Sequence, residues 1–409
     1  MANTIKFGNG IWATKESSTL AYNDENENFK PLPFEFSRGS KATVVNKEGL
    51  IETVGNDMPR IDYLDNSKGA LLLEPTRTNL FTYSEDFSDS YWSKSNVTIT
   101  SNYGISPDGQ NNAYKLVENT NTGEHNIKPT SVSSNIYTMS VFAKYDGRIL
   151  QIASTSTGGH YANFDLLNGV IGDSGVATEN ITMTKVSNGW YRCSMTTTSN
   201  MNTAIINTVQ STTSAYQESY QGDGSSGVYI WGAQLEEGSY STSLIKTNGS
   251  SATRVADECS GAGNEQVINS TEGALYFEGN FSDINSLYSA FTIGNSANTS
   301  LVRFYRANNT TLNASIFDSG TWIWNYSLTI DTTQNFKIAL QWSSNIFNAF
   351  VNGVKLTGAT SQNSFTLSSL SKINIGNESM AFPFYGNTKD VRVYDVALTD
   401  QELVDLTTI

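Results

Sequence analysis

The 409-residue sequence has few of the residues that build metal sites and covalent crosslinks. It contains two cysteines, Cys193 and Cys259, and two histidines, His125 and His160. Neither a disulfide framework nor a Cys/His zinc site can be assembled from so few residues. We therefore predict that both cysteines are reduced, partly buried thiols.

Basic residues are also scarce, with 25 Lys and Arg against 39 Asp and Glu and a formal net charge of −14. Nucleic-acid and anionic membrane surfaces attract clusters of Lys and Arg, so neither is expected as a partner. The charge also argues against a polyanionic capsule as ligand at low salt, where repulsion is least screened. Disorder is excluded as well, because aromatic residues reach 11% while charged residues reach only 16%.

Long apolar runs are absent. The first ten residues, Met1–Gly10, lack the apolar stretch of a secretory signal, and the densest apolar run is Ala70–Leu73. A membrane-spanning helix needs about 20 consecutive apolar residues. We expect no membrane insertion, and a chain made in a cytoplasm that, if exported, leaves it without a cleaved signal.

Catalytic motifs are missing too. There is no G-x-S-x-G elbow, no H-E-x-x-H and no P-loop, and Gly222–Gly227 matches G-x-G-x-x-G only where it precedes a predicted strand. Glycoside hydrolysis stays open, because its two carboxylates need to be close only in space. No local carboxylate pair stands out, so we expect no enzyme activity and no cofactor.

The polar residues that are present, chiefly Ser, Thr, Asn and Gly, favour turns and strands over helices. Alternating apolar positions in Tyr137–Tyr145 and in Phe336–Trp342 predict half-buried strands. Asn352-Gly353 between two apolar strands predicts a type I′ hairpin. One helix is expected at the C-terminus, where Thr399 and Glu402 form a capping box.

These signals predict an all-β fold with two β-sandwich (jelly-roll) domains after a mostly irregular N-terminal segment. The chain is too long for one core, since single domains usually have about 100–200 residues. We place the N-terminal segment at residues 1–75, one sandwich at 76–255 and the second at 256–409.

An aromatic stripe is the candidate binding site. In Thr321–Tyr326 the alternate positions Trp322, Trp324 and Tyr326 should share one strand face, and Tyr305 follows Arg303 by two positions. Sugar rings present apolar faces that stack on Trp and Tyr, while polar neighbours bind the hydroxyls. The candidate glycan-binding residues are therefore Arg303, Tyr305, Trp322, Trp324 and Tyr326; the alternative is that this face is the sandwich core.

Specific phrases in the first quarter of the chain resemble the head of bacteriophage fibre and spike proteins. These phrases are Phe36–Thr43 (FSRGSKAT), Gly49–Thr53 (GLIET), Pro59–Tyr63 (PRIDY), Leu71–Leu80 (LLLEPTRTNL) and Tyr83–Phe87 (YSEDF) with Trp92.

Later phrases resemble two lectin-like modules. The middle of the chain is similar to phage-borne carbohydrate-binding-module-like jelly rolls, at Ser140–Lys144, Asn188–Arg192, Ile230–Gly238 and Thr253–Asp257. The tail is similar to concanavalin A-like or laminin-G-like lectin domains, at Glu272–Tyr276, Phe336–Gln341, Val351–Gly353 and Val391–Leu398.

The resemblance implies a fibre protein on the virion surface that binds host cell-surface glycan, forms a homotrimer and contacts other virion proteins through residues 1–75. It leaves open whether the fibre stands on the tail or the head. The alternatives are a head fibre that decorates the capsid in a structural role, and a polysaccharide-degrading glycoside hydrolase. A structural calcium ion is a family possibility in both jelly-roll types, with Asp86 and Asp108 as the candidate ligands.

Overall fold

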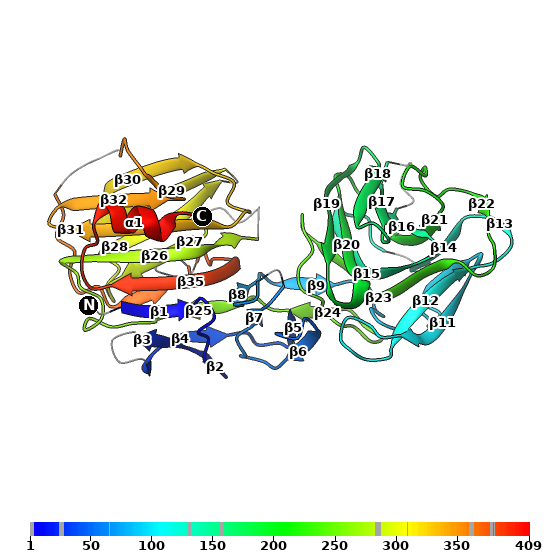
Figure 1. Ribbon diagram of the computed structural model, residues 1–409, viewed down its shortest axis with the longest axis horizontal. Coiled ribbons are helices and arrows are strands. Elements are labelled where there is room, and N and C mark those ends of the chain that lie inside the picture. Colours follow the sequence, from blue (N-terminus) through cyan, green and yellow to red (C-terminus); the bar gives the residue numbers. More distant parts are fainter. Residues whose placement is uncertain are drawn as a thin grey trace. The chain divides into compact units, whose positions relative to one another are not determined.

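The computed structural model describes residues 4–23, 28–64, 66–129, 132–154, 159–282, 288–308, 310–359, 364–376, 379 and 381–409. The chain forms two compact units (Figure 1). Unit 1 comprises Met1–Lys41, Val54–Pro75 and Val255–Ile409, and unit 2 comprises Ala42–Thr53 and Thr76–Arg254. Both are built almost wholly from antiparallel strands, so the predicted all-β sandwich class is confirmed.

Unit 1 packs a large sheet against a five-stranded sheet. The large sheet runs in the order β25-β4-β3-β1-β35-β26-β31-β32-β33, with β2 beside β3 and with β8, itself paired to β7, beside β35. Its strands are β1 Thr4–Gly8, β2 Thr14–Lys15, β3 Ser18–Asn23, β4 Asn28–Ser37, β7 Ile61–Asp62, β8 Ala70–Leu73, β25 Glu258–Ser260, β26 Glu272–Phe281, β31 Phe336–Ser343, β32 Ile346–Val351, β33 Val354–Lys355 and β35 Gly386–Tyr394.

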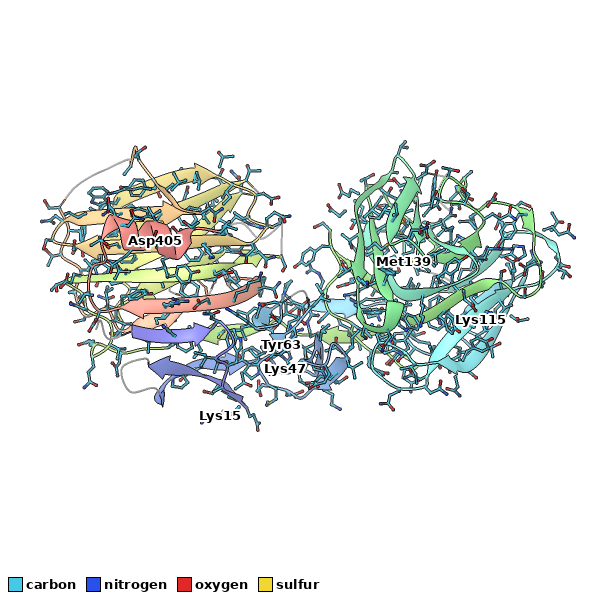
Figure 2. The ribbon with its side chains drawn as sticks, viewed as in Figure 1. Lys15, Lys47, Tyr63, Lys115, Met139 and Asp405 are labelled. Atoms are coloured by element: carbon cyan, nitrogen blue, oxygen red, sulfur yellow. The ribbon has the colours of Figure 1, made fainter. Side chains whose placement is uncertain are left out.

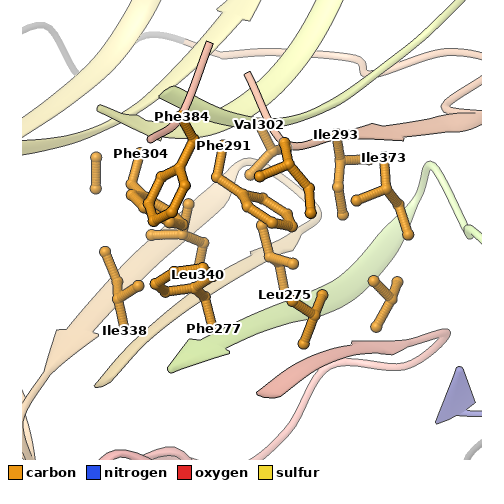
Figure 3. Packing of buried hydrophobic residues seen from close by; sticks show 14 of the residues in the cluster. Leu275, Phe277, Phe291, Ile293, Val302, Phe304, Ile338, Leu340, Ile373 and Phe384 are labelled. Atoms are coloured by element: carbon orange, nitrogen blue, oxygen red, sulfur yellow. The ribbon is translucent and has the colours of Figure 1, made fainter. Parts of the chain in front are cut away.

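The second sheet of unit 1 runs in the order β30-β29-β28-β27-β34. Its strands are β27 Ala290–Gly294, β28 Ser300–Asn308, β29 Thr311–Asp318, β30 Thr321–Thr329 and β34 Lys372–Asn374. Between the sheets lies an aromatic core, in which the rings of Phe277 and Phe304 are 4.9 Å apart and those of Phe291 and Phe304 are stacked at 5.6 Å (Figure 3).

The N-terminal residues differ from the mostly irregular segment that the sequence predicts. Strand β1 pairs with β35 from Thr4 to Gly8, and β8 pairs with the other half of the same edge of β35. The alternation Ile5/Phe7 places both side chains in the unit 1 core, together with Phe34 and Phe36 of β4. These alternations are too short to predict strands from the sequence. In the fold, β1 and β8 together cover an edge of β35 that would otherwise be open.

Local predictions for the C-terminal half hold. Strands β32 and β33 form a hairpin in which Asn352 and Gly353 have φ of 50° and 80°, as a type I′ turn requires. Helix α1, Asp400–Thr407, begins after the Thr399–Glu402 capping box. Both predictions are confirmed.

Unit 2 is a sandwich of two six-stranded sheets, in the orders β10-β14-β21-β16-β17-β18 and β11-β12-β23-β15-β20-β19. Its core includes Met139 of β15, and Lys115 lies on β12 (Figure 2). The strands of the two sheets are β10 Trp92–Ser95, β11 Val97–Gly104, β12 Ala113–Glu118, β14 His125–Pro129, β15 Tyr137–Asp146, β16 Ile149–Ala153, β17 Tyr161–Asp165, β18 Val170–Ser174, β19 Thr178–Lys185, β20 Tyr191–Thr197, β21 Ile205–Val209 and β23 Gly227–Glu237.

Short elements complete this unit. The pairs are β5 Ala42–Val45 with β6 Ile51–Val54, β9 Arg77–Asn79 with β24 Ala252–Arg254, and β13 Thr122–Gly123 with β22 Tyr220–Gln221, and a single 3₁₀ turn, η1, spans Ser187–Gly189. Cys193 and Cys259 form no disulfide, and both are fully buried, where the sequence predicts partly buried thiols. In the part of the chain that the structure describes, no helix has the length and apolar character needed to cross a membrane.

A buried ion cluster, formed by Arg38, Arg60, Glu74 and Asp257, holds the N-terminal residues in unit 1. Arg60 donates to Glu74 at 2.6 Å and also to Asp257, and Arg38 donates to the second oxygen of Asp257 at 3.1 Å. Burial alone would lower the pKa of Arg60, but the charges and hydrogen bonds of Asp257 and Glu74 outweigh it and raise that pKa above its usual range. Two positive and two negative charges therefore balance inside the unit.

Replacing Arg60 by methionine should destabilise unit 1 strongly. Arg60→Met keeps much of the side-chain volume but removes the guanidinium that bonds both buried carboxylates, Glu74 and Asp257. Breaking a buried pair by removing one partner costs about 3–5 kcal/mol. We expect a loss of that size in the free energy of unfolding, measured by urea denaturation.

A matched control is Lys355→Met, which removes the cation of an exposed pair with Asp400 in the same unit. Exposed pairs contribute about 0–1 kcal/mol, so this variant should unfold almost as the parent does. Equal stability of the two variants would show that the buried cluster does not hold unit 1 together.

Candidate functional site

Three of the predicted residues meet on the outer face of the five-stranded sheet. On β28, Val302 and Phe304 point into the core, so the alternate residues Arg303 and Tyr305 point away from it. On β30, Trp322 keeps 41% of its surface exposed. The register places Trp322 opposite Phe317 of β29 and Arg303 opposite Ser315 of the same strand.

A β-bulge separates Trp322 from the other two residues of the predicted stripe. Ile316 pairs with Trp324, but Phe317 pairs with Trp322, so Ile323 is one extra residue on β30. A bulge of this kind turns two consecutive residues to the same side. Strict alternation predicts that Trp322, Trp324 and Tyr326 share one face of the strand. Because of the bulge, Trp322 faces the opposite side from the other two.

Trp324 and Tyr326 belong to the inner face. Tyr326 is 6% exposed within the unit 1 core, and its hydroxyl donates to the carbonyl oxygen of Phe347 at 3.1 Å. Burial raises the pKa of Tyr326. Trp324 is half-buried and packs edge-on against Phe347. These two residues therefore lie where the alternative interpretation of the stripe, as part of the sandwich core, places them.

The guanidinium of Arg303 lies over two aromatic rings at once. Its central carbon is 4.0 Å from the ring centre of Trp322 and 4.5 Å from that of Tyr305. The Trp322 ring also contacts Phe317 at 4.7 Å. Cation–π contacts of this kind hold all three planar groups in a fixed arrangement on the sheet. We call the four residues Arg303, Tyr305, Phe317 and Trp322 the outer-face patch.

Polar and aromatic neighbours extend the outer-face patch. Asn313 donates to the Tyr305 hydroxyl at 2.8 Å and accepts from Ser327 at 2.7 Å, which fixes the orientation of all three. Beyond Tyr305, the exposed ring of Tyr288 stacks on it at 6.4 Å and contacts exposed Phe382 at 5.7 Å. The result is a row of flat rings flanked by amide and hydroxyl groups.

The sequence did not single out Phe317, Asn313, Ser327, Tyr288 or Phe382. For the β29 residues a signal existed, since Leu312, Ala314 and Ile316 alternate with Asn313, Ser315 and Phe317 as inner and outer positions. Tyr288 and Phe382 lie outside regular strands, and only the fold brings them to the patch.

The candidate calcium ligands do not assemble a metal site. Asp86 accepts hydrogen bonds from the Ser88 hydroxyl at 2.5 Å and the Tyr114 hydroxyl at 2.9 Å. Burial raises its pKa, but these bonds outweigh burial and bring the pKa below its usual value. Asp86 therefore stabilises a turn of unit 2.

Asp108 is likewise engaged by protein groups. It accepts from the Ser106 hydroxyl at 2.5 Å and from the Lys246 ammonium at 3.3 Å. Burial raises its pKa, but the bonds from Ser106, Gln110 and Lys246 lower the pKa further than burial raises it. The Lys246 ammonium lies beside Asp108. The described residues contain no group of three or more His, Cys, Asp or Glu side chains placed to hold a metal.

Comparison with protein-family models and with curated proteins gives no match. Similar solved structures include the CBM40 domain of the Ruminococcus gnavus IT-sialidase with bound α2,3-sialyllactose, at 19% identity and a TM-score of 0.30, which covers 35% of this chain and 86% of that one. Domains LG4-5 of the mouse laminin α1 chain match at 11% identity over 68% of this chain and 89% of that chain, with a TM-score of 0.25.

The tail fibre protein gp63.1 of an Escherichia coli phage is similar at 10% identity and a TM-score of 0.21, over 79% of this chain and 41% of that one. With TM-scores between 0.21 and 0.30, neither the ligands nor the roles of these proteins transfer to this chain.

Truncating the two tryptophans of β30 should lower the free energy of unfolding by different amounts. Trp324→Ala removes a ring from the core and should lower the free energy of unfolding by about 2–4 kcal/mol. Trp322→Ala acts on the outer face and should cost less than about 1 kcal/mol. Urea denaturation of both variants measures the difference, and equal losses would contradict the bulge.

Proposed function

We propose that this chain is a non-catalytic bacteriophage fibre protein that binds a host cell-surface glycan through the outer-face patch. The observation that carries the proposal is the guanidinium of Arg303 over the exposed ring of Trp322 and the ring of Tyr305. Planar groups held in place on strands form a binding surface that loses little conformational freedom when a ligand arrives.

The chemistry of the outer-face patch suits a saccharide. The apolar face of a sugar ring stacks on Trp and Tyr, and its hydroxyl groups hydrogen-bond with nearby amides and hydroxyls. Here Trp322 offers the ring, and the hydroxyl groups of Ser327 and Tyr305, which buried Asn313 holds in place, offer the polar groups. Tryptophan, tyrosine and arginine are also the residues that dominate binding energy at protein surfaces.

A non-catalytic role accords with the composition of the site. Glycosidic cleavage requires two cooperating carboxyl groups, and none of the four residues of the outer-face patch is acidic. This surface therefore supplies recognition rather than acid–base chemistry.

The proposal that the protein belongs to a virion rests on the sequence phrases. The phrases from Phe36 to Phe87 resemble the head of phage fibre and spike proteins. In such a particle, residues 1–75 would contact other virion proteins and three chains would form a homotrimer. Several copies raise the effective concentration at a cell surface, so weak single sites are sufficient for adhesion.

Trp322→Ala should weaken glycan binding while leaving the fold intact. Losing a central aromatic contact typically weakens binding by at least about tenfold. The measurement is binding of the multimerised protein to an array of bacterial glycans and to host cells. Blank results for the parent protein in both assays at high protein concentration would contradict glycan recognition.

Two further variants test whether the binding depends on the outer-face patch. Tyr103→Ala removes an exposed aromatic ring from unit 2 and should leave binding unchanged. Arg303→Lys keeps the charge but removes the planar group that lies over both rings, so it should weaken binding. Parent-like binding by Trp322→Ala would place the site elsewhere.

A further inference from the structure

Two adjoining hollows lie in unit 1 apart from the outer-face patch. The larger, of about 850 Å³, lies between β25, β34 and the loop at residues 261–266. The second, of about 400 Å³, continues along residues 265–270. Both are lined by Glu265 and Gln266, so together they form one continuous depression, which we call the edge groove.

The edge groove follows the side of the sandwich where the edges of its two sheets meet. Strand β25 ends the strand order of the large sheet, and β34 ends that of the five-stranded sheet. The backbone groups of Ala262 and Ile373 exchange hydrogen bonds of 3.1 and 2.7 Å, which join the two edges. The floor of the groove is therefore fixed by backbone pairing.

The wall that carries Glu265 and Gln266 is also rigid. The side-chain oxygen of Asn264 accepts from the backbone of Gln266 at 2.9 Å, and its carbonyl oxygen accepts from Val267 and Ile268 at 3.2 and 3.1 Å. Val267 and Ile268 are 6% and 1% exposed and anchor the turn in the core. Glu265 and Gln266, by contrast, are exposed. The groove thus presents polar side chains from a preorganised turn.

The lining selects for a hydroxyl-rich ligand. Its volumes lie within the range of about 300–1,000 Å³ that is typical of ligand sites. Ile268 is the only apolar side chain among the described residues that line the groove, and the others are Ser, Asn, Gln, Gly, Glu, Asp and Lys. A saccharide would find hydrogen-bonding partners along the groove.

Charge narrows the class of saccharide. Among the described lining residues, Glu35, Glu265 and Asp395 stand against the single cation Lys372. The excess of negative charge adds to the net charge of −14 of the whole chain. Uronic or sialic acid polymers would be repelled, so the groove favours uncharged chains.

We propose that the edge groove binds a segment of an uncharged polysaccharide, as a second site of the same chain. The proposal rests on the proposed function, because it gives the glycan-binding role an additional contact. It assigns hydrogen bonding with sugar hydroxyls to Glu265 and Gln266, which stand where the two hollows meet.

The test is affinity electrophoresis of the full chain in native gels that contain dextran, galactomannan or mixed-linkage β-glucan, with alginate as the polyanionic comparison. The parent should be retarded by at least one neutral polymer and not by alginate. The double variant Glu265→Ala/Gln266→Ala should raise the apparent dissociation constant about tenfold, the loss expected for a charge-assisted hydrogen bond.

The matched control is Glu16→Ala/Gln401→Ala, which removes an exposed Glu and an exposed Gln of unit 1 outside the groove and changes the charge equally. Control and parent should be retarded alike. Ser371→Trp, which places a bulky ring in the larger hollow, should weaken retardation as the double variant does.

Each other outcome overturns the proposal. Retardation that Trp322→Ala removes and Glu265→Ala/Gln266→Ala does not would leave the outer-face patch as the site and remove the groove. No retardation of the parent by any neutral polymer would remove the groove as well, while binding on the glycan array would still decide the proposed function. Release of reducing ends that Glu35→Gln and Glu265→Gln abolish would replace binding by hydrolysis.

Discussion

The buried ion cluster of Arg38, Arg60, Glu74 and Asp257 is the constraint on which unit 1 depends. Three of these residues come from the first 75 residues and the fourth from position 257, and all four lose water on folding. A buried charge is tolerated only when its partners are in place. The N-terminal strands and the C-terminal sandwich must therefore form together, because neither part can bury its charges without the other. Strands β1, β3, β4 and β8 are accordingly part of the large sheet rather than of a detachable arm.

The same cluster brings together residues from several of the phrases that the sequence analysis singles out. Arg38 lies in Phe36–Thr43, Arg60 in Pro59–Tyr63, and Glu74 in Leu71–Leu80. The fourth member, Asp257, ends Thr253–Asp257. These phrases thus contain charged residues that meet in one place. Asp257 lies more than 180 positions along the chain from the other three. In the sequence these phrases are separate. Only the fold shows that each contributes one residue to the same buried cluster.

How far the structure could be predicted depends on whether the deciding contact is local. The hairpin at Asn352-Gly353, the helix after Thr399 and the strand Phe336–Ser343 follow from nearest neighbours, and each was found in the sequence. Of the predicted stripe, Arg303, Tyr305 and Trp322 meet on one face, whereas Trp324 and Tyr326 pack with the core. The cause is one extra residue, Ile323, whose effect on register depends on pairing with β29 and has no signature in composition or period.

The bulge also determines what the five-stranded sheet can present. With strict alternation, Trp322 would face the core with Trp324, and Arg303 would lose one of its two rings; the inserted residue turns Trp322 outward instead. The outer-face patch then lies toward the β30 edge of the sheet, while the edge groove lies at β34, four strands away. At about 4.8 Å per strand the two edges are about 19 Å apart, a distance that several linked sugar rings can span. One site is aromatic with a cation and the other is polar with excess negative charge. If both bind neutral glycan as proposed, a single chain that contacts both would bind more tightly, because binding at one site raises the effective concentration at the other.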